Sequence, residues 1–220
     1  MATVSLTAEE RAKRIRLIIF DVDGVLTDGG IWLFPAPAPS HTTSDKAQEM
    51  EGKGGYAIAS ATMLEAKGFN AHDGSGISLA RLGGMKCGII TKRISEAVAL
   101  RARDLRLEYV YMGQSFKMQA VREIMEKESL TLEEIAYVGD DIIDLPVMRQ
   151  CGLAIAVANA RPQVKAAAHY MTANNGGHGA GRDAVDFILK AKGILDEVIE
   201  RYIDERDPTV KNLEIEKGGI

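Results

Sequence analysis

The residues best suited to chemistry are two carboxylates that follow an apolar run near the start of the chain. Asp21 and Asp23 stand two positions apart after residues 17–20, and Gly24 follows them. In open α/β sheets, ligands bind beyond the carboxyl ends of the strands, which is where such a pair would lie. Because Asp and Gly also favour turns, a polar strand end without chemistry is the alternative interpretation.

A second apolar run, residues 135–139, ends in the same way. It is followed by Asp140, Asp141 and, three positions later, Asp144. If the two strand ends meet, several like charges share one site and cannot all stay ionised without a cation. Carboxylate oxygens with no nearby His or Cys favour a hard cation, so the sequence predicts Mg²⁺ rather than Zn²⁺.

Two further strand ends offer groups that could bind a phosphate. Thr91 follows the run 86–90, and Lys117 stands where a loop enters a helix. A single Thr at a strand end is usually a β-former, and a single Lys is usually a solvated surface charge. Because Thr91 and Lys117 follow successive predicted strands, a phosphate-binding role is favoured for both. A hydroxyl and an ammonium in these positions would offset the charge of a phosphoryl group.

The elements that must position these residues follow the pattern of a parallel α/β sheet, in which short β-branched runs alternate with helical periods. The predicted strands are residues 16–21, 86–91, 109–112, 135–139, 154–158 and 169–172. The predicted helices are 94–105, 117–127, 145–150 and 162–168. Apolar residues from Val185 to Tyr202 recur at three- and four-residue steps and predict one last helix.

Residues 35–64 interrupt this alternation, and we interpret them as an insertion after the first strand. The proline-rich residues 34–40 predict an extended, polyproline-like chain, and residues 56–66 predict a helix. Residues 1–203 are otherwise expected to form a single domain. The charged, poorly periodic residues 204–220 predict a mobile tail.

Composition excludes several classes of protein. The chain has 220 residues, of which 46% are hydrophobic and 26% charged, as is usual for a globular protein. Its net charge of −4 gives no reason to expect a nucleic acid or a membrane surface as partner. No apolar run predicts a signal peptide or a membrane span, so a cytoplasmic protein is expected. Cys87 and Cys151 predict two reduced core thiols.

Taken in order, the four motifs resemble those of the haloacid dehalogenase superfamily of phosphotransferases, which carry DxDG, a strand-terminal Thr or Ser, a Lys and an acidic GDD-type sequence. The resemblance covers roughly residues 14–196 outside the insertion. It implies a Rossmann-like, doubly wound parallel sheet. It also implies that Asp21 attacks phosphorus to form an aspartyl-phosphate, with Asp23 as acid and then base. Thr91 and Lys117 would bind the transferring phosphoryl group.

The same resemblance implies where a Mg²⁺ ion would be held. Asp21, the backbone carbonyl of Asp23, and Asp140 would be its ligands. Either Asp141 or Asp144 would support the metal shell or Lys117, and Asp141 is the one expected in the metal site.

Longer matches favour one branch of the superfamily. Residues 21–29, 68–74, 113–117, 137–148 and 176–182 are similar to the 3-deoxy-D-manno-octulosonate 8-phosphate phosphatases and their nonulosonate 9-phosphate relatives. That branch lacks a large cap domain, is tetrameric, and joins neighbouring subunits through a β-hairpin after the first strand. It implies a homotetramer acting on a small phosphorylated sugar acid in lipopolysaccharide biosynthesis.

Three features depart from that branch. Lys92 stands where the branch usually has Gly, which makes the phosphate loop more basic and less flexible. His72 replaces a usual Arg, which weakens a contact to the sugar carboxylate, and the insertion lengthens the hairpin region. The residues expected to contact the substrate are Gly24, Lys92, His72 and Arg182. For Arg182 the alternative is equally open, because the glycine-rich residues 176–181 could be a linker.

Other classes of protein fit less well. A receiver domain also uses acidic groups, Mg²⁺, a Thr and a Lys, but its phospho-acceptor follows a middle strand and its domain is shorter. A non-catalytic protein that binds a phosphosugar is a second alternative, although every residue that the chemistry requires is present. Phosphoryl transfer to another sugar, and hydrolysis of another small phosphometabolite, both stay open.

Overall fold

A six-stranded parallel sheet forms the centre of the protein, with the strand order β11-β10-β9-β1-β6-β8. The computed structural model describes residues 6–36, 46–49, 56–59, 63–204, 206, 207 and 209. The central strands are β1 (Leu17–Phe20), β6 (Lys86–Ile90), β8 (Tyr109–Tyr111), β9 (Ile135–Gly139), β10 (Leu153–Ala156) and β11 (Tyr170–Met171). The predicted doubly wound α/β sheet is confirmed, and all six predicted strands are present with slightly different ends.

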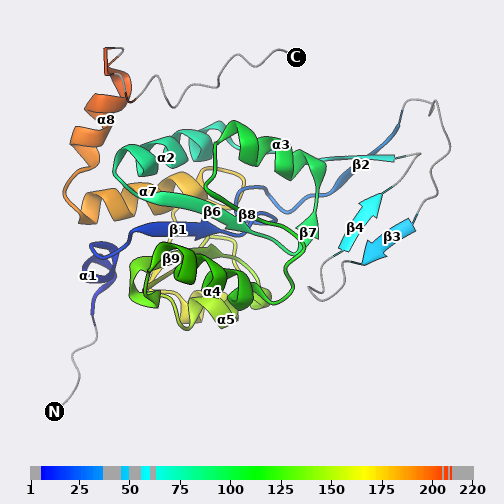
Figure 1. Ribbon diagram of the computed structural model, residues 1–220, viewed down its shortest axis with the longest axis horizontal. Coiled ribbons are helices and arrows are strands. Elements are labelled where there is room, and N and C mark those ends of the chain that lie inside the picture. The colour runs from blue at the N-terminus through cyan, green and yellow to red at the C-terminus, as the bar shows by residue number, and fades with distance from the viewer. Residues whose placement is uncertain are drawn as a thin grey trace.

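Helices cover both faces of this sheet (Figure 1). One face carries α2 (Ala71–Leu82), α3 (Glu96–Asp104) and α7 (Ala180–Ala191), and the other carries α4 (Lys117–Glu128), α5 (Leu145–Met148) and α6 (Pro162–Ala167). The remaining helical elements are α1 (Ala8–Ala12), α8 (Leu195–Ile203) and the 3₁₀ turns η1 (Leu132–Glu134) and η2 (Ile142–Asp144). Because both faces are covered, every residue of β1 and β9 is buried.

The site lies where the order of the strands reverses. β1 pairs with β6 on one side and with β9 on the other, and Phe20 stands level with both Ile89 and Val138. The three strands therefore end at one edge of the sheet. Such a switch point is where open α/β sheets bind ligands.

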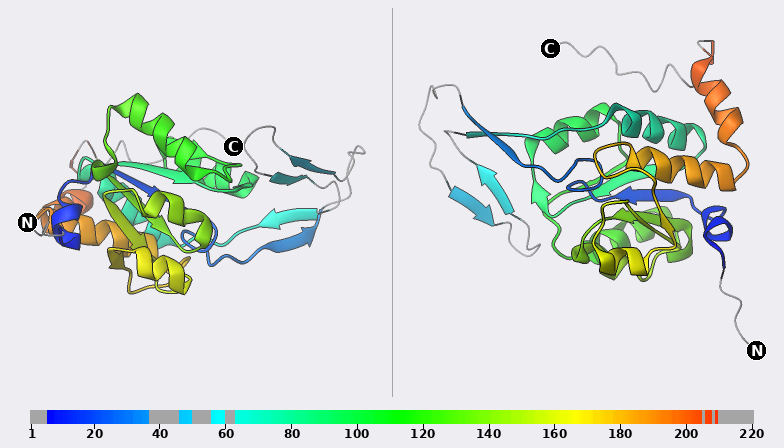
Figure 2. Two further views of the ribbon diagram at one scale, coloured as in Figure 1. Left: turned by 90° about the horizontal axis from the view of Figure 1, so that it is seen from below. Right: turned by 180° about the vertical axis from the view of Figure 1, so that it is seen from behind.

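A two-stranded antiparallel arm projects from the sheet. β2 (Trp32–Pro35) pairs with β5 (Met63–Ala66). Between them in the chain, β3 (Lys46–Glu49) and β4 (Tyr56–Ala59) form a second hairpin, and β4 pairs with β7 (Arg93–Ile94). Figures 1 and 2 show both hairpins at the end of the molecule opposite α1. The expected β-hairpin after the first strand is confirmed, and no large cap domain is evident in the described ranges.

The helix predicted at residues 56–66 is wrong, because the described parts of this segment are the strands β4 and β5. Ala, Met, Leu and Glu favour helices intrinsically. Here β2 and β3 supply partners for the backbone, and such long-range pairing overrides local preference. Of the polyproline-like segment, Pro35 lies in β2, whereas residues 37–40 lie outside the described residues, as does most of the predicted tail 204–220.

Two helices also differ from the sequence pattern. The single last helix is divided into α7 and α8, because Gly193 adopts a φ of +74°, a conformation that ends helices and suits glycine. The pattern also fails to predict α2, since Gly74 and Gly76 weaken its helical signal. Gly76 has a packing role, because a Cβ there would lie only 3.0 Å from the Cα of Arg182 on α7.

The interior and the helices agree with two further expectations. Cys87 and Cys151 are buried free thiols, as predicted. Among the described residues, no helix combines the length and the apolarity that crossing a membrane requires.

Candidate active site

Asp21, the first residue beyond β1, lies at the centre of the site. Its Oδ1 accepts a hydrogen bond from the backbone amide of Val22 at 2.7 Å and lies 2.9 Å from Nζ of Lys117. Burial raises the pKa of Asp21 to about 7; the charge of Lys117 opposes this shift and that of Asp144 adds to it. Asp21 therefore needs further positive charge nearby if it is to stay fully ionised at neutral pH.

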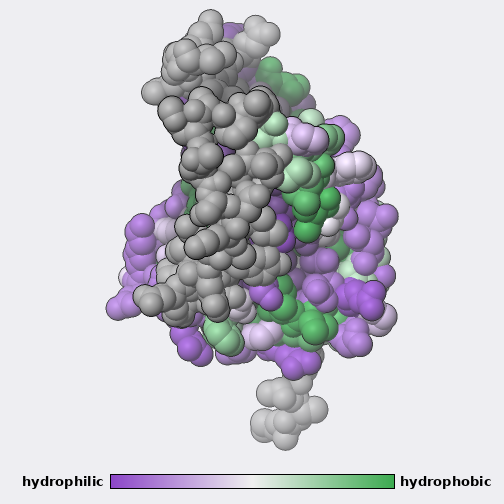
Figure 3. All heavy atoms as spheres, turned by 90° about the vertical axis from the view of Figure 1, so that its right-hand side faces the viewer, coloured by the Kyte–Doolittle hydropathy of each residue, from purple (hydrophilic) through white to green (hydrophobic). Residues whose placement is uncertain are grey.

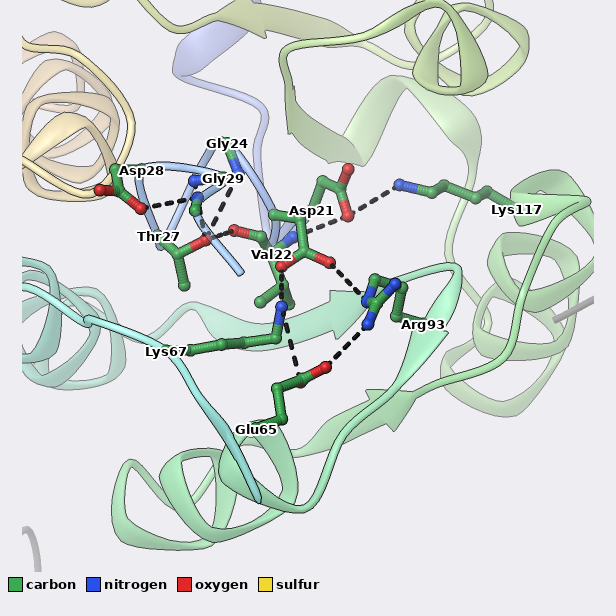
Figure 4. Close-up of polar contacts among 12 residues, drawn as sticks. Asp21, Val22, Gly24, Thr27, Asp28, Gly29, Glu65, Lys67, Arg93 and Lys117 are labelled. Carbon is green, nitrogen blue, oxygen red and sulfur yellow. Dashed lines mark hydrogen bonds and ion pairs between the residues drawn. The ribbon is translucent and has the colours of Figure 1, made fainter. Parts of the chain in front are cut away.

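Lys117 reaches Asp21 from the start of α4 (Figure 4), and its side chain is completely buried. Burial favours the neutral amine, but the carboxylates of Asp21 and Asp144 outweigh it and raise the pKa of Lys117. Asp144 accepts hydrogen bonds from Lys117 at 2.7 Å, the Tyr137 hydroxyl at 2.8 Å, and the amides of Asp140 and Asp141 at 3.0 and 3.2 Å. These donors fix Asp144, which in turn fixes Lys117.

Asp140, the first residue beyond β9, completes a cluster of carboxylates. Burial, together with the charges of Asp21 and Asp144, raises the pKa of Asp140 to about 8. Gly24 allows this approach, because its φ is +90° and a Cβ on it would lie 2.3 Å from Oδ2 of Asp140. One carboxylate oxygen from each of the three aspartates lies within 4.8 Å of the others.

The cluster fits a divalent cation. Three carboxylates facing the one ammonium of Lys117 give a formal charge of −2. Oδ1 of Asp140 is buried without a hydrogen-bond partner among the described residues. An all-oxygen donor set with excess negative charge suits Mg²⁺. Asp21 and Asp140 are the better placed ligands, because both oxygens of Asp144 already accept hydrogen bonds.

Asp141 lies outside this group of three. Its side chain is exposed, and its Oδ1 accepts a hydrogen bond from the backbone amide of Ile142 at 2.8 Å, which begins η2. Of the two residues considered as partners of Lys117, the structure therefore pairs Asp144 with it. A role for Asp141 in the metal site stays a prediction.

Thr91 and Lys92 follow β6, the strand next to β1. Thr91 is buried; its amide donates to the carbonyl of Tyr111 and its own carbonyl accepts from the amide of Gln114, both at 2.9 Å. These bonds tie Thr91 to the last residue of β8 and to the loop that follows it. Thr91 thus lies at the same sheet edge as Asp21, with the half-buried Lys92 beside it. Their contacts to a phosphate stay predictions.

Asp23 makes its ion pairs at the base of the arm rather than in the carboxylate cluster. Its Oδ1 pairs with Nζ of Lys67, and its Oδ2 lies 4.0 Å from Nε of Arg93. Glu65 approaches the same two cations, at 2.7 Å from Nη2 of Arg93 and 3.8 Å from Nζ of Lys67 (Figure 4). Partial burial raises the pKa of Glu65, but the hydrogen bond from Arg93 and the charges of Lys67 and Arg93 outweigh it, so the pKa is lowered.

Sequence reasoning missed Glu65, Lys67 and Arg93 as members of the site. The available signal was the pair of opposite charges two positions apart in residues 63–69, which a strand would place on one face. Because this segment was predicted to be helical, the pairing with Asp23 could not be foreseen.

The glycine-rich segment packs directly against the DxDG loop. The amide of Gly177 donates to the carbonyl of Val25 at 3.0 Å, and a Cβ on Gly176 would clash with the carbonyl of Gly24 at 1.7 Å. His72 is exposed in the first turn of α2, close to Gly179. The contacts of Gly176 and Gly177 with the DxDG loop favour a closely packed glycine-rich segment over a free linker.

Arg182 is held between α2 and α7. Its Nε lies 2.7 Å from Oδ1 of Asp186, and its Nη1 lies 3.1 Å from Oγ of Ser75. Its contact with a substrate carboxylate, like that of His72, stays a prediction.

Comparisons with known proteins agree with this geometry. Residues 91–182 match the family model of the haloacid dehalogenase-like hydrolases. The chain is also 39% identical over 194 residues to the 3-deoxy-D-manno-octulosonate 8-phosphate phosphatase KdsC of Escherichia coli (strain B / BL21-DE3), which covers 88% of this chain and 89% of that protein. The chain belongs to the haloacid dehalogenase-like hydrolases.

Solved structures place this hydrolase in the same branch. The 3-deoxy-D-manno-octulosonate 8-phosphate phosphatase from Yersinia pestis is 36% identical, with a TM-score of 0.72 over 86% of this chain and 88% of that one. The enzyme of the same name from Moraxella catarrhalis, in complex with a magnesium ion, a phosphate ion and a KDO molecule, is 32% identical, with a TM-score of 0.72 over 89% and 97% of the two chains. The resemblance expected from the motifs is confirmed.

Proposed function

We propose that this hydrolase removes the phosphate group of 3-deoxy-D-manno-octulosonate 8-phosphate in a Mg²⁺-dependent reaction. The observation that carries the proposal is the buried Asp21 at the switch point, with Nζ of Lys117 at 2.9 Å and the Asp140 carboxylate in the same cluster. The names of the relatives, at 39% identity over most of both chains, support the choice of substrate.

In the first step, a carboxylate oxygen of Asp21 attacks phosphorus. The bond from phosphorus to the sugar oxygen breaks as the aspartyl-phosphate bond forms, and Asp23 gives its proton to the departing oxygen. The sugar acid leaves as an alcohol. Covalent catalysis of this kind divides one difficult hydrolysis into two easier displacements.

In the second step, Asp23 acts as a base. It takes a proton from a water molecule, whose oxygen attacks phosphorus and displaces Asp21. Inorganic phosphate leaves, Asp21 is again a carboxylate, and Asp23 again holds a proton for the next substrate. The same group can serve in both steps because each step returns it to the form that the other needs.

Charge must be offset before a carboxylate can approach a phosphate. Lys117 supplies one positive charge at Asp21, and Asp144 keeps it there. The Thr91 hydroxyl and Lys92 are proposed to bind the other phosphoryl oxygens. Mg²⁺, held by Asp21, Asp140 and the carbonyl of Asp23, would neutralise further charge on the phosphoryl group when bound.

The test is phosphate release from a panel of substrates, with Mg²⁺ or with EDTA. The panel contains octulosonate 8-phosphate, nonulosonate 9-phosphates and simple hexose phosphates. We expect Mg²⁺-dependent release with the highest kcat/KM for the eight-carbon acid. A preference for another phosphate would overturn the substrate, and release that EDTA does not diminish would overturn the metal dependence.

We also propose that four chains assemble through the arm. Its strands expose large apolar side chains, with Trp32 58%, Leu33 51%, Phe34 51% and Leu64 52% accessible. Figure 3 views the molecule from the arm side and shows hydrophobic residues at this surface. Apolar surface of this kind marks interaction sites. Light scattering should give a tetramer, and Leu33→Asp with Leu64→Asp should give smaller species; a monomeric wild type would contradict the proposal.

A cytoplasmic location is the last part of the proposal. Buried free thiols such as Cys87 and Cys151 are what a reducing compartment preserves. Cell fractionation would test it, and recovery outside the cytoplasm would contradict it.

A further inference from the structure

Lys67 is a buried ammonium that none of the recognised motifs includes. It follows β5 directly, and its side chain is 0% exposed. A buried charge is tolerated only when it is paired, because the loss of hydration is otherwise too costly. The carboxylates that meet it are Asp23, in direct contact, and Glu65 at 3.8 Å. The pairing of Lys67 with Asp23 is therefore a fixed part of the fold.

The contact constrains the carboxylate on which both steps of the reaction depend. Asp23 lies on a turn, and its side chain is 24% exposed. Lys67 engages Oδ1 of this carboxylate. Arg93 is farther away, at 4.0 Å from Oδ2, and its guanidinium is held by Glu65 at 2.7 Å. Of these two cations, Lys67 therefore makes the shorter contact with Asp23.

We propose that Lys67 is a positioning residue for Asp23, holding one carboxylate oxygen so that the other is aimed at the departing oxygen of the substrate. The inference rests on the proposed function, in which Asp23 is the acid. A proton donor contributes about 10²- to 10⁴-fold to rate only when it lies within hydrogen-bond reach of the atom it protonates. A carboxylate free to rotate would lose much of that contribution.

The pairing also connects the arm to the chemistry. Glu65 lies in β5 and Lys67 directly after it, so the strand that carries apolar surface also leads into the residue that contacts Asp23. Holding the arm in place therefore holds the acid in place.

The experiment measures how rate depends on the leaving group. Substituted phenyl phosphates, from p-nitrophenyl phosphate to phenyl phosphate, share one phosphoryl group and differ in how much their departing oxygen needs a proton. The value of kcat/KM reports steps up to departure of the phenol and is independent of the later hydrolysis. We expect Lys67→Met to lose about tenfold more on phenyl phosphate than on p-nitrophenyl phosphate. Lys67→Arg should restore most of the difference.

Two further variants separate this inference from the proposed function. Asp23→Asn should show the same steepening, because it removes the proton donor itself. Lys86→Met should show none, because Lys86 pairs with Glu128 at the surface away from the site. If Asp23→Asn steepens the dependence and Lys67→Met does not, the positioning role is wrong and the acid role stands. If neither variant does, the acid role of Asp23 is wrong and the inference falls with it.

A structural role for Lys67 predicts a different result. Loss of packing alone would lower kcat/KM by the same factor for every phenol, and that outcome overturns the inference. Circular dichroism and thermal unfolding show whether Lys67→Met folds. If it does not, Lys67→Gln takes its place with the same expected steepening, because its side chain is one atom shorter than that of Lys and lacks the charge that engages Asp23.

Discussion

Two charged clusters meet at the DxDG loop and balance their charge differently. In the first, the carboxylates of Asp21, Asp140 and Asp144 surround one ammonium, with a formal charge of −2. The second cluster sets Asp23 and Glu65 against Lys67 and Arg93, with a formal charge of zero. The pKa values differ in the same way. Burial and repulsion raise the pKa values of Asp21 and Asp140 to about 7 and about 8. In the second cluster, the neighbouring cations lower the pKa of Glu65 despite its partial burial.

Because their charges differ, the two clusters are suited to different functions. The first is incomplete until a cation joins it, so it can bind one and use it against a phosphate. The second is complete within the chain and can hold a carboxylate in place without a metal. A tight turn separates them: the carbonyl of Val22 accepts hydrogen bonds from the amides of Val25, Leu26 and Thr27. Asp21 and Asp23 therefore enter different environments although one residue separates them.

Replacing the nucleophile should have the largest effect. Asp21→Asn keeps the shape of the side chain but cannot form the aspartyl-phosphate, so turnover should be abolished while the fold is retained. Phosphate release and circular dichroism measure the two results. Asp28→Asn is the matched control, because Asp28 is an exposed carboxylate of the same loop outside both clusters. Turnover by Asp21→Asn at the wild-type rate would refute the mechanism.

Removing the single cation of the first cluster should have the largest effect on stability. Lys117→Met leaves Asp21 and Asp144 buried without their partner, and breaking a buried pair in this way costs about 3–5 kcal/mol. Urea unfolding measures the loss. The double variant with Asp144→Asn should recover part of it, because one unpaired charge is removed as well. A loss under about 1 kcal/mol would mean that Lys117 is not needed to balance the cluster.

Metal and pH should act together on the first cluster. The folded pKa values of Asp21 and Asp140, about 7 and about 8, lie above the ordinary 3.8. Between these limits the folded protein binds more protons than the unfolded one, so without metal its free energy of unfolding should fall as pH rises from about 4 to 8. Mg²⁺ binds the ionised carboxylates and should add about 2.7 kcal/mol at 100 times its Kd.

The measurement is thermal unfolding at pH 5 and pH 8, each with EDTA and with Mg²⁺. Stabilisation by Mg²⁺ should be larger at pH 8, and Asp140→Asn should reduce it. Equal stabilisation at both pH values would show that these two carboxylates do not bind the ion.

The sequence predicted most of the first cluster but not the second. Asp21, Lys117 and Asp140 each follow a strand or begin a helix, and the ends of parallel strands meet by topology alone. The choice between Asp141 and Asp144 stayed open, because both follow the same strand and only their contacts distinguish them. Asp23 was also identified, but its nearer partner, Lys67, directly follows β5 of the arm, and the residues before it, 56–66, were predicted to be helical. No local pattern reveals which distant strand will pair with Met63–Ala66. Only that strand pairing brings Glu65 and Lys67 close to Asp23.

The same limit explains the errors in the helices. Gly74 and Gly76 reduce the helical propensity of α2, yet they are what lets α2 approach its neighbours closely. Close packing supplies a stabilisation that propensity does not include. At Gly193 the apolar stripe continues from α7 into α8, so periodicity alone could not show that the backbone turns there.

The smallest expected effect comes from comparing Gly24→Ala with Gly84→Ala, which tests whether the contact between Gly24 and Asp140 shapes the metal site. Gly24 and Gly84 both have positive φ, +90° and +79°, so an Ala at either position should cost about 1–2 kcal/mol of backbone strain. At Gly84 a Cβ meets nothing within 4 Å, whereas at Gly24 it would lie 2.3 Å from Oδ2 of Asp140. Both variants should therefore lose stability in EDTA, Gly24→Ala more than Gly84→Ala because of the clash with Asp140, but only Gly24→Ala should also bind Mg²⁺ more weakly, because its new methyl group displaces a ligand. Titrating the melting temperature with Mg²⁺ separates the two effects, and equal Mg²⁺ affinity in both variants would show that contact between Gly24 and Asp140 does not shape the metal site.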